Sequence, residues 1–172
     1  MIIVFTGNGK GKTTAALGQA LRTVGQGKKV LMVQFIKGPW KSGEDFSHKR
    51  LEPDFVLKKM GLGFVGILDD TLPLSEHVRA AEEAFSYFET SLRSRAWDML
   101  ILDEINVAVD LGLLSPERVL TSLNEVPLTT FVLLTGRGAH PSFIERADLV
   151  TEMREIKHPF NDGKLAQIAL DF

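Results

Sequence analysis

The stretch Thr6-Gly7-Asn8-Gly9-Lys10-Gly11-Lys12-Thr13, near the start of the chain, decides the fold. The apolar run Ile2–Phe5 precedes it, and a helix-prone stretch begins at Thr14. Strand, glycine-rich turn, Lys-Thr and helix is the order of a phosphate-binding loop (P-loop), although Thr6 stands where the general pattern has glycine. Such a turn and the start of its helix direct backbone N–H groups at anions. We therefore expect a nucleotide-phosphate site, and the alternative is a glycine-rich hairpin with two exposed lysines.

The composition is ordinary for a globular protein. The chain has 172 residues, of which 44% are hydrophobic and 24% charged, and its net charge is −2. These values fit a single domain over residues 1–172 and give no case for a nucleic-acid partner. The sequence has no cysteine, which suits a reducing cytoplasm, and no apolar run near the ~18 residues of a membrane span. Because the N-terminus enters a strand rather than a secretion signal, we expect a cytoplasmic protein.

Apolar strand-like segments alternate with helical patterns along the chain. We expect strands at residues 1–6, 30–35, 55–58, 99–103, 130–135 and 149–155. We expect helices at residues 14–24, 75–94, 116–126 and 141–147, and a short one through residue 109. This alternation predicts an α/β fold, a mostly parallel sheet flanked by helices, of the RecA-like P-loop NTPase type. Residues 36–50 and 60–68 are expected to be loops, the second either tucked against the core or facing a ligand.

Two acids follow the apolar strand at residues 99–103. Ligands of such sheets bind beyond the carboxyl ends of the strands, where Asp103 and Glu104 are expected. In P-loop proteins an acid at this place holds magnesium, and Thr13 with one or two carboxylates suits that ion. The alternative is a solvated loop start. Arg137, between two glycines, either brings its guanidinium to a phosphate or a carboxylate or lies in a surface turn. No arrangement of the four histidines suggests a metal site or a hydrolytic triad.

Beyond the P-loop, several segments together resemble one family, the ATP:corrinoid adenosyltransferases of the P-loop type, also called cob(I)yrinic acid a,c-diamide adenosyltransferases. The P-loop is shared by many NTPases, whereas the combination of QFIKG with TGRG is specific. The segments that carry the resemblance are Thr6–Ala16, Val33–Gly38, Gly43-Glu44, Leu102–Glu104, Leu134–Gly138, Ala147-Asp148, Lys157–Phe160, Gly163, Ala166-Gln167 and Asp171-Phe172.

The resemblance implies a transfer reaction. Reduced cobalt, Co(I), of a corrinoid such as cob(I)alamin or cob(I)yrinic acid a,c-diamide attacks the 5′ carbon of ATP, and triphosphate leaves. No protein base is needed, which fits the lack of a His or Ser constellation. The family binds ATP in an orientation reversed from that of ordinary NTPases. It also implies magnesium, an electron-donating reductase and a homodimer.

The resemblance further implies roles for particular residues. Lys12 and Glu104 would be catalytic, and Thr13 and Glu104 would ligate magnesium with Asp103 assisting. Met60, Gly63 and Phe64 would contact the corrinoid. The residues implied in ATP binding are Gly7, Asn8, Gly9, Lys10, Gly11, Lys12, Thr13, Thr14 and Arg137.

The sequence departs from the family pattern in the loop at residues 60–68. The family has Gly-x-Gly-Phe-x-Trp here, and its aromatics help to displace the lower axial ligand of cobalt. Phe64 matches, but Gly66 replaces the tryptophan, and neither Trp40 nor Trp97 occupies the matching position. The enzyme would then prefer corrinoids that lack a strong lower ligand, or it would be slower. Because the first strand begins at Met1, we also expect no N-terminal lid.

Two other functions compete with the transferase. A RecA-like, ATP-hydrolysing switch or motor would engage a macromolecular partner, and the mild acidity of the chain counts against a polymer such as DNA. A small-molecule kinase would need a base and an acceptor pocket, and the sequence identifies neither.

Overall fold

The computed structural model describes residues 1–67, 70–163 and 165–170. Its centre is a six-stranded sheet in which every neighbouring pair is parallel, with the order β3-β2-β4-β5-β1-β6. The strands are β1 (Ile2–Thr6), β2 (Val30–Gln34), β3 (Phe55–Lys59), β4 (Met99–Asp103), β5 (Phe131–Thr135) and β6 (Leu149–Glu152). The predicted parallel α/β sheet is confirmed. Because β5 separates the P-loop strand β1 from the acid-bearing strand β4, the order is that of RecA-like P-loop proteins.

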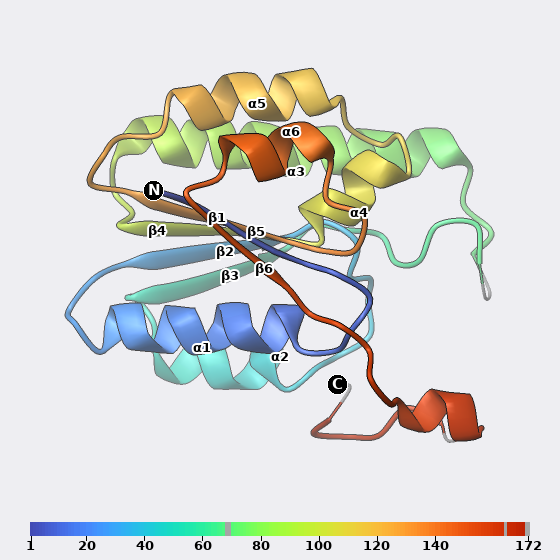
Figure 1. The fold of residues 1–172 in the computed structure, drawn as a ribbon. Coiled ribbons are helices and arrows are strands. Elements are labelled where there is room, and N and C mark those ends of the chain that lie inside the picture. Colours follow the sequence, from blue (N-terminus) through green and yellow to red (C-terminus); the bar gives the residue numbers. More distant parts are fainter. Residues whose placement is uncertain (68–69, 164, 171–172) are drawn as a thin grey trace.

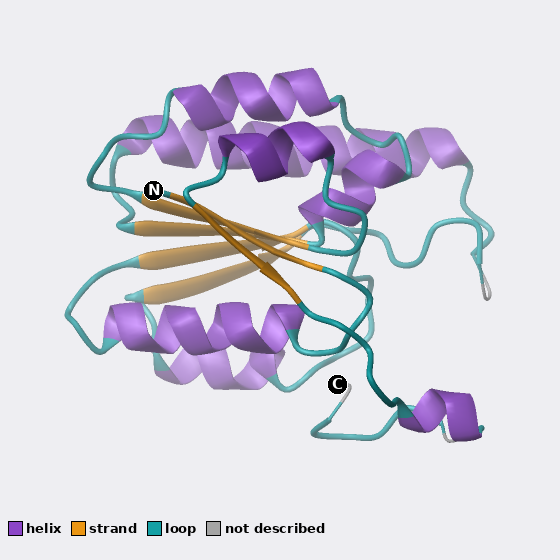
Figure 2. Ribbon diagram, in the orientation of Figure 1, coloured by secondary structure: helices purple, strands orange, loops and turns teal. Residues whose placement is uncertain are grey.

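Helices cover both faces of the sheet (Figures 1 and 2). One face carries α1 (Lys12–Val24) and the short α2 (Glu44–Ser47). The other carries α3 (Leu74–Ser94), α4 (Ile105–Asp110), α5 (Pro116–Asn124) and α6 (Pro141–Arg146). The larger core lies under this second layer, where α3 buries its apolar stripe. None of the helices in the described ranges is long and apolar enough to cross a membrane.

Local chemistry sets where several helices begin. Pro116 opens α5, and the Ser115 hydroxyl accepts a hydrogen bond from the backbone N–H of Arg118 at 3.2 Å, as an N-cap does. Helix α1 begins at Lys12, two residues before the expected start. Gly11, at φ +115°, lets the chain pass from the P-loop directly into the helix.

Two further expectations, for residues 36–50 and for the end of the last strand, were wrong. Residues 36–50 are not all loop, because they contain α2 and a 3-10 turn at His48–Arg50. The Asp45 carboxylate accepts from the backbone N–H of Ser42 at 2.8 Å, which helps to start this helix. Strand β6 ends at Glu152 rather than at residue 155, since the next residues turn across the P-loop, where the carbonyl of Met153 accepts from Gly9.

The segments that leave β1, β2, β4 and β5 emerge at one edge of the sheet, on the right in Figure 1. This is the edge predicted for ligand binding. The C-terminal segment, including a 3-10 turn at Pro159–Asp162, extends from the end of β6 away from the sheet.

Candidate active site

The P-loop forms as predicted and encloses the side chain of Lys12. The Lys12 Nζ donates to the carbonyls of Gly7 and Gly9 at 2.7 and 2.8 Å, and the residue is only 7% exposed. Burial is the main cause that lowers the pKa of Lys12, and the nearby charge of Glu104 acts in the opposite direction. The loop therefore carries a concentrated positive charge that a phosphate can approach.

Two P-loop glycines are required by packing against the chain that follows β6. A Cβ on Gly9 would lie 2.7 Å from the carbonyl carbon of Arg154, and one on Gly7 would lie 2.4 Å from the oxygen of Met153. The Gly9 N–H donates to the Met153 carbonyl at 2.7 Å. From the sequence, we expected these glycines to let the loop approach a phosphate closely. Their packing against Met153 and Arg154 is a second reason for glycine at both positions. A phosphate that used the Gly9 N–H would have to displace Met153.

Asp103 links the P-loop to two neighbouring strands. Its carboxylate is fully buried and accepts from the hydroxyls of Thr13 and Thr135 at 2.9 and 2.8 Å, and from the Gln34 amide at 3.1 Å. Burial raises the pKa of Asp103, although Lys37 and these donors oppose the rise. Asp103 thus fixes the hydroxyl of Thr13.

Glu104 is a largely buried acid whose negative charge the neighbouring positive charges offset only in part. It adopts a left-handed backbone at φ +64°, held by a hydrogen bond from its N–H to the Thr135 hydroxyl at 2.9 Å. Burial, and then the charge of Asp103, raise the pKa of Glu104 to about 7, against the opposing charges of Lys12, Lys37 and Arg137. Such a carboxylate favours the binding of a further cation.

Gln34, at the end of β2, joins this site together with Lys37 and Glu44 from the segment that follows. The sequence did not indicate roles for these three residues. The Gln34 amide donates to Glu44 at 3.3 Å as well as to Asp103, and Lys37 pairs with Glu44. Burial would raise the pKa of Glu44, but the hydrogen bond and charge of Lys37 outweigh it and lower the pKa. One sequence signal could have indicated a site role for Gln34 and Thr135. Each is a polar residue at the end of an otherwise apolar strand.

The remaining predicted ATP residues lie around the same loop. Asn8, Lys10 and Thr14 are exposed on the P-loop and at the start of α1. Arg137 is also exposed, in a turn between two glycines of positive φ. Its charge lowers the pKa values of Lys12 and Glu104, so the guanidinium lies near both. The structure therefore brings the predicted P-loop, acid and arginine residues together.

The three predicted corrinoid residues have different environments. Met60 packs against the larger core, and Gly63 is buried. Phe64 is 46% exposed and contacts the ring of Trp40, with ring centroids 5.6 Å apart. Leu68, at the end of the predicted loop, lies outside the described residues. Phe64 is therefore the one of the three that offers an exposed side chain.

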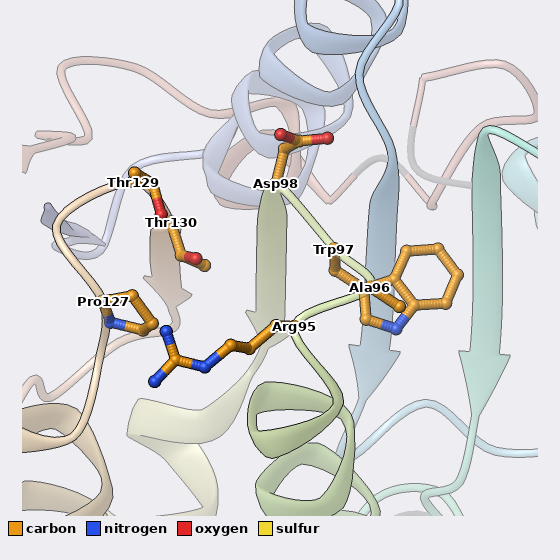
Figure 3. Close-up of a pocket in the computed structure, with 7 residues that line it drawn as sticks. All are labelled: Arg95, Ala96, Trp97, Asp98, Pro127, Thr129 and Thr130. Carbon is orange, nitrogen blue, oxygen red and sulfur yellow. The ribbon is translucent and has the colours of Figure 1, made fainter.

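A small cavity lies at the opposite edge of the sheet (Figure 3). It measures about 110 Å³ and is lined by the turns that lead into β4 and β5. Arg95 extends across it toward Pro127, and Trp97 lies beside it (Figure 3). Trp97 is thus far from the strand ends that carry Asp103 and Thr135.

A substitution of Thr135 tests the hydrogen bonding around the two acids. Thr135→Val should lower the free energy of unfolding by about 1–3 kcal/mol, because Asp103 loses a donor and the Glu104 N–H loses an acceptor in a buried place. Urea unfolding of the ligand-free protein measures this change. Thr135→Ser keeps the hydroxyl and is the control. Equal stability of the Val and Ser variants would show that these bonds contribute nothing.

Together, the parallel sheet, the P-loop around Lys12 and the acids at the end of β4 define a nucleotide-binding protein of the P-loop class. Comparison with known proteins narrows the class. The chain belongs to the family described as ATP:corrinoid adenosyltransferase BtuR/CobO/CobP, whose model matches residues 1–172. It is therefore a transferase that moves the adenosyl group of ATP to a corrinoid, and the switch or motor alternative is not favoured.

Individual relatives agree with this family. The chain is 45% identical to the corrinoid adenosyltransferase of Escherichia coli K12 and 42% identical to corrinoid adenosyltransferase CobA of Salmonella typhimurium LT2. Each match covers 100% of this chain and 85% of the relative. A solved structure, a KaiC-like protein of Pyrococcus horikoshii, matches 91% of this chain and 74% of its own, with a TM-score of 0.49 and 18% identity.

Proposed function

We propose that the edge formed by the carboxyl ends of the strands holds ATP and a reduced corrinoid together, so that Co(I) attacks the 5′ carbon of ATP. A Co–C bond forms, the C5′–O bond breaks, and its electron pair leaves with the triphosphate. Cobalt passes from Co(I) to Co(III). The observation that carries the proposal is the ammonium of Lys12, held inside the P-loop of a family member that acts on ATP.

The P-loop side of the site binds the leaving group. We assign the triphosphate to the backbone of Gly7–Thr13, with Lys12 and Arg137 supplying positive charge and Thr14 continuing the start of α1. Negative charge grows on the triphosphate as the C5′–O bond breaks. Positive groups fixed in advance at that place stabilise the transition state more than the ground state. No side chain is required to move a proton.

The residues around Asp103 and Glu104 fit a magnesium ion. Within the described ranges, no three His, Cys, Asp or Glu side chains converge as a metal site, so the protein would supply few ligands. Magnesium commonly keeps several waters and takes the rest from carboxylates and phosphates. Buried oxygens of Gln34 and Asn106 lack hydrogen-bond partners in the described part of the chain and could accept from such waters. We assign Thr13 and Glu104 as ligands, with Asp103 positioning Thr13. When bound, the ion would neutralise charge on the triphosphate.

We also assign the corrinoid site, the electron donor, the oligomeric state and the compartment. We assign the corrinoid to the loop at residues 60–67, with Phe64 as its contact and with Met60 and Gly63 supporting that loop. Because the reaction begins from Co(I), a reductase must supply an electron to Co(II). The family resemblance favours a homodimer, and the absence of cysteine favours a reducing cytoplasm.

A product analysis tests the proposed function. The protein is incubated with magnesium, ATP and chemically reduced cobalamin under anaerobic conditions. We expect the absorption spectrum of adenosylcobalamin to appear together with one equivalent of free triphosphate. Formation of ADP and phosphate, with no new cobalt–carbon species, would refute the transfer.

Phe64→Ala tests the corrinoid assignment. We expect this variant to lose about tenfold more activity when cobalamin enters as Co(II) with a reductant than when it enters as Co(I), because an apolar contact that displaces the lower ligand matters only before reduction. The two transfer rates are measured side by side. Phe46→Ala, which removes another exposed phenylalanine, on α2, is the control. Equal losses from both cobalt states would remove Phe64 from ligand displacement.

A further inference from the structure

Two exposed aromatic side chains meet where the segments after β2 and β3 run side by side. Trp40 is 57% exposed and Phe64 is 46% exposed. Their ring centroids lie 5.6 Å apart and their planes are tilted by 35°. Leu62 and Ile67, in the same loop as Phe64, are exposed as well. Large apolar groups gathered in this way at the ligand-binding edge indicate a binding surface.

The position of Trp40 is fixed by the backbone around it. The Gly63 N–H donates to the Ile36 carbonyl at 2.9 Å, and a Cβ on Gly38 would lie 2.7 Å from the Cα of Gly63. A Cβ on Gly63 would lie 3.1 Å from the indole of Trp40. The two segments are therefore in close contact, and the tryptophan rests on the glycine that precedes Phe64.

Lys59 anchors the backbone of the segment that carries Trp40. Its Nζ donates to the Trp40 carbonyl at 2.8 Å and to the Asp45 carboxylate at 2.6 Å. Asp45 in turn accepts from the backbone N–H of Ser42. An exposed tryptophan with an anchored backbone loses little conformational entropy when it binds a flat apolar ligand.

The surface adjoins the proposed nucleotide site. Lys37, three residues before Trp40, influences the pKa values of both Asp103 and Glu104. Gly66, where the family resemblance places a tryptophan, has φ +68°, and its N–H donates to Asp70 at 2.7 Å. A tryptophan at position 66 would strain this backbone. Trp40 instead brings an indole beside Phe64 from a different segment.

We propose that Trp40 and Phe64 together form the surface that contacts the lower face of the corrin ring, with Trp40 supplying the aromatic group that position 66 lacks. This proposal rests on the proposed function. The exposed aromatic pair matches the flat face of a large ring system, and the neighbouring P-loop site accounts for the triphosphate end of ATP. Trp40 is thus a substrate-contacting residue that determines affinity for the corrinoid.

Fluorescence measures the contact without requiring transfer. The chain has two tryptophans, so Trp97→Phe leaves Trp40 as the only one and Trp40→Phe leaves Trp97. Cobinamide, a corrinoid without the nucleotide loop, is titrated into each variant, and free N-acetyltryptophanamide corrects for light absorbed by the ligand. We expect saturable quenching of Trp40, at least threefold stronger than that of Trp97. Equal quenching of the two would overturn the proposal.

Kinetics provides the second measurement. Trp40→Ala should raise the KM for the corrinoid about tenfold and leave the KM for ATP within twofold, whereas Trp40→Phe should retain most of the affinity. An unchanged corrinoid KM in Trp40→Ala would contradict the role of Trp40 while leaving the transferase intact. Absence of transfer in the unaltered protein would instead refute the proposed function, and the quenching experiment would still decide the contact.

Discussion

Lys12→Ala is expected to lower kcat for adenosyl transfer by about 10²–10³, which is the effect of removing one fixed group that stabilises developing charge. The Lys12 Nζ now lies between the carbonyls of Gly7 and Gly9, inside the loop to which we assign the triphosphate. Without it, negative charge on the leaving group loses its buried counter-charge. Steady-state transfer, with both ATP and cob(I)alamin saturating, gives kcat directly.

Lys29→Ala is the matched control for this variant. Lys29 is exposed just before β2, at the edge of the sheet opposite the P-loop, so its loss should leave kcat unchanged. Thermal unfolding of both variants separates lost catalysis from lost folding. A Lys12→Ala protein that folds normally and turns over at the original rate would remove Lys12 from the site.

Glu104→Gln is expected to lower the rate of transfer and to raise the stability of the ligand-free protein. We expect transfer to fall by about 10²-fold, because the amide replaces a carboxylate that we assign to magnesium. In the ligand-free protein with a chelator, the same change should raise Tm at pH 8 by roughly 5 °C. The pKa of Glu104 near 7 in place of 4.5 corresponds to at most about 3 kcal/mol of unfavourable charge burial.

The size of this gain in stability depends on pH. Because folding raises the pKa of Glu104, the folded protein binds the proton more tightly than the unfolded chain does. The unaltered protein therefore loses stability as the pH rises from about 4.5 through 7. Glu104→Gln does not titrate, so its advantage should be present at pH 8 and shrink toward pH 5. Glu125→Gln, which removes an exposed acid on the surface, is the control for this comparison. An advantage for Glu104→Gln that is equal at both pH values would contradict this origin.

The sequence was sufficient to predict the sheet and the polar groups at the edge formed by the carboxyl ends of its strands. Buried parallel strands read as continuous apolar runs, and the P-loop signature lay between a strand and a helix, as it must. Asp103 could be placed near Thr13 because the ends of parallel strands meet at one edge. The hydrogen bond between them, at 2.9 Å, agrees with that inference.

Contacts between residues distant in sequence could not be predicted in the same way. The packing of Met153 and Arg154 on the P-loop depends on where the chain turns after an edge strand, and no periodic pattern encodes that turn. Trp40 and Phe64 meet because two irregular segments run together beyond β2 and β3. Their positions are set by glycine contacts and by Lys59, which are properties of the folded chain.

The structure of the protein bound to magnesium and ATP tests the central claim most directly. We predict that the triphosphate lies in the loop Gly7–Thr13, that the Nζ of Lys12 exchanges the carbonyls of Gly7 and Gly9 for phosphate oxygens, and that the 5′ carbon faces the side of Trp40 and Phe64. A bound nucleotide that left this loop empty, with Lys12 still held by the two carbonyls, would contradict it.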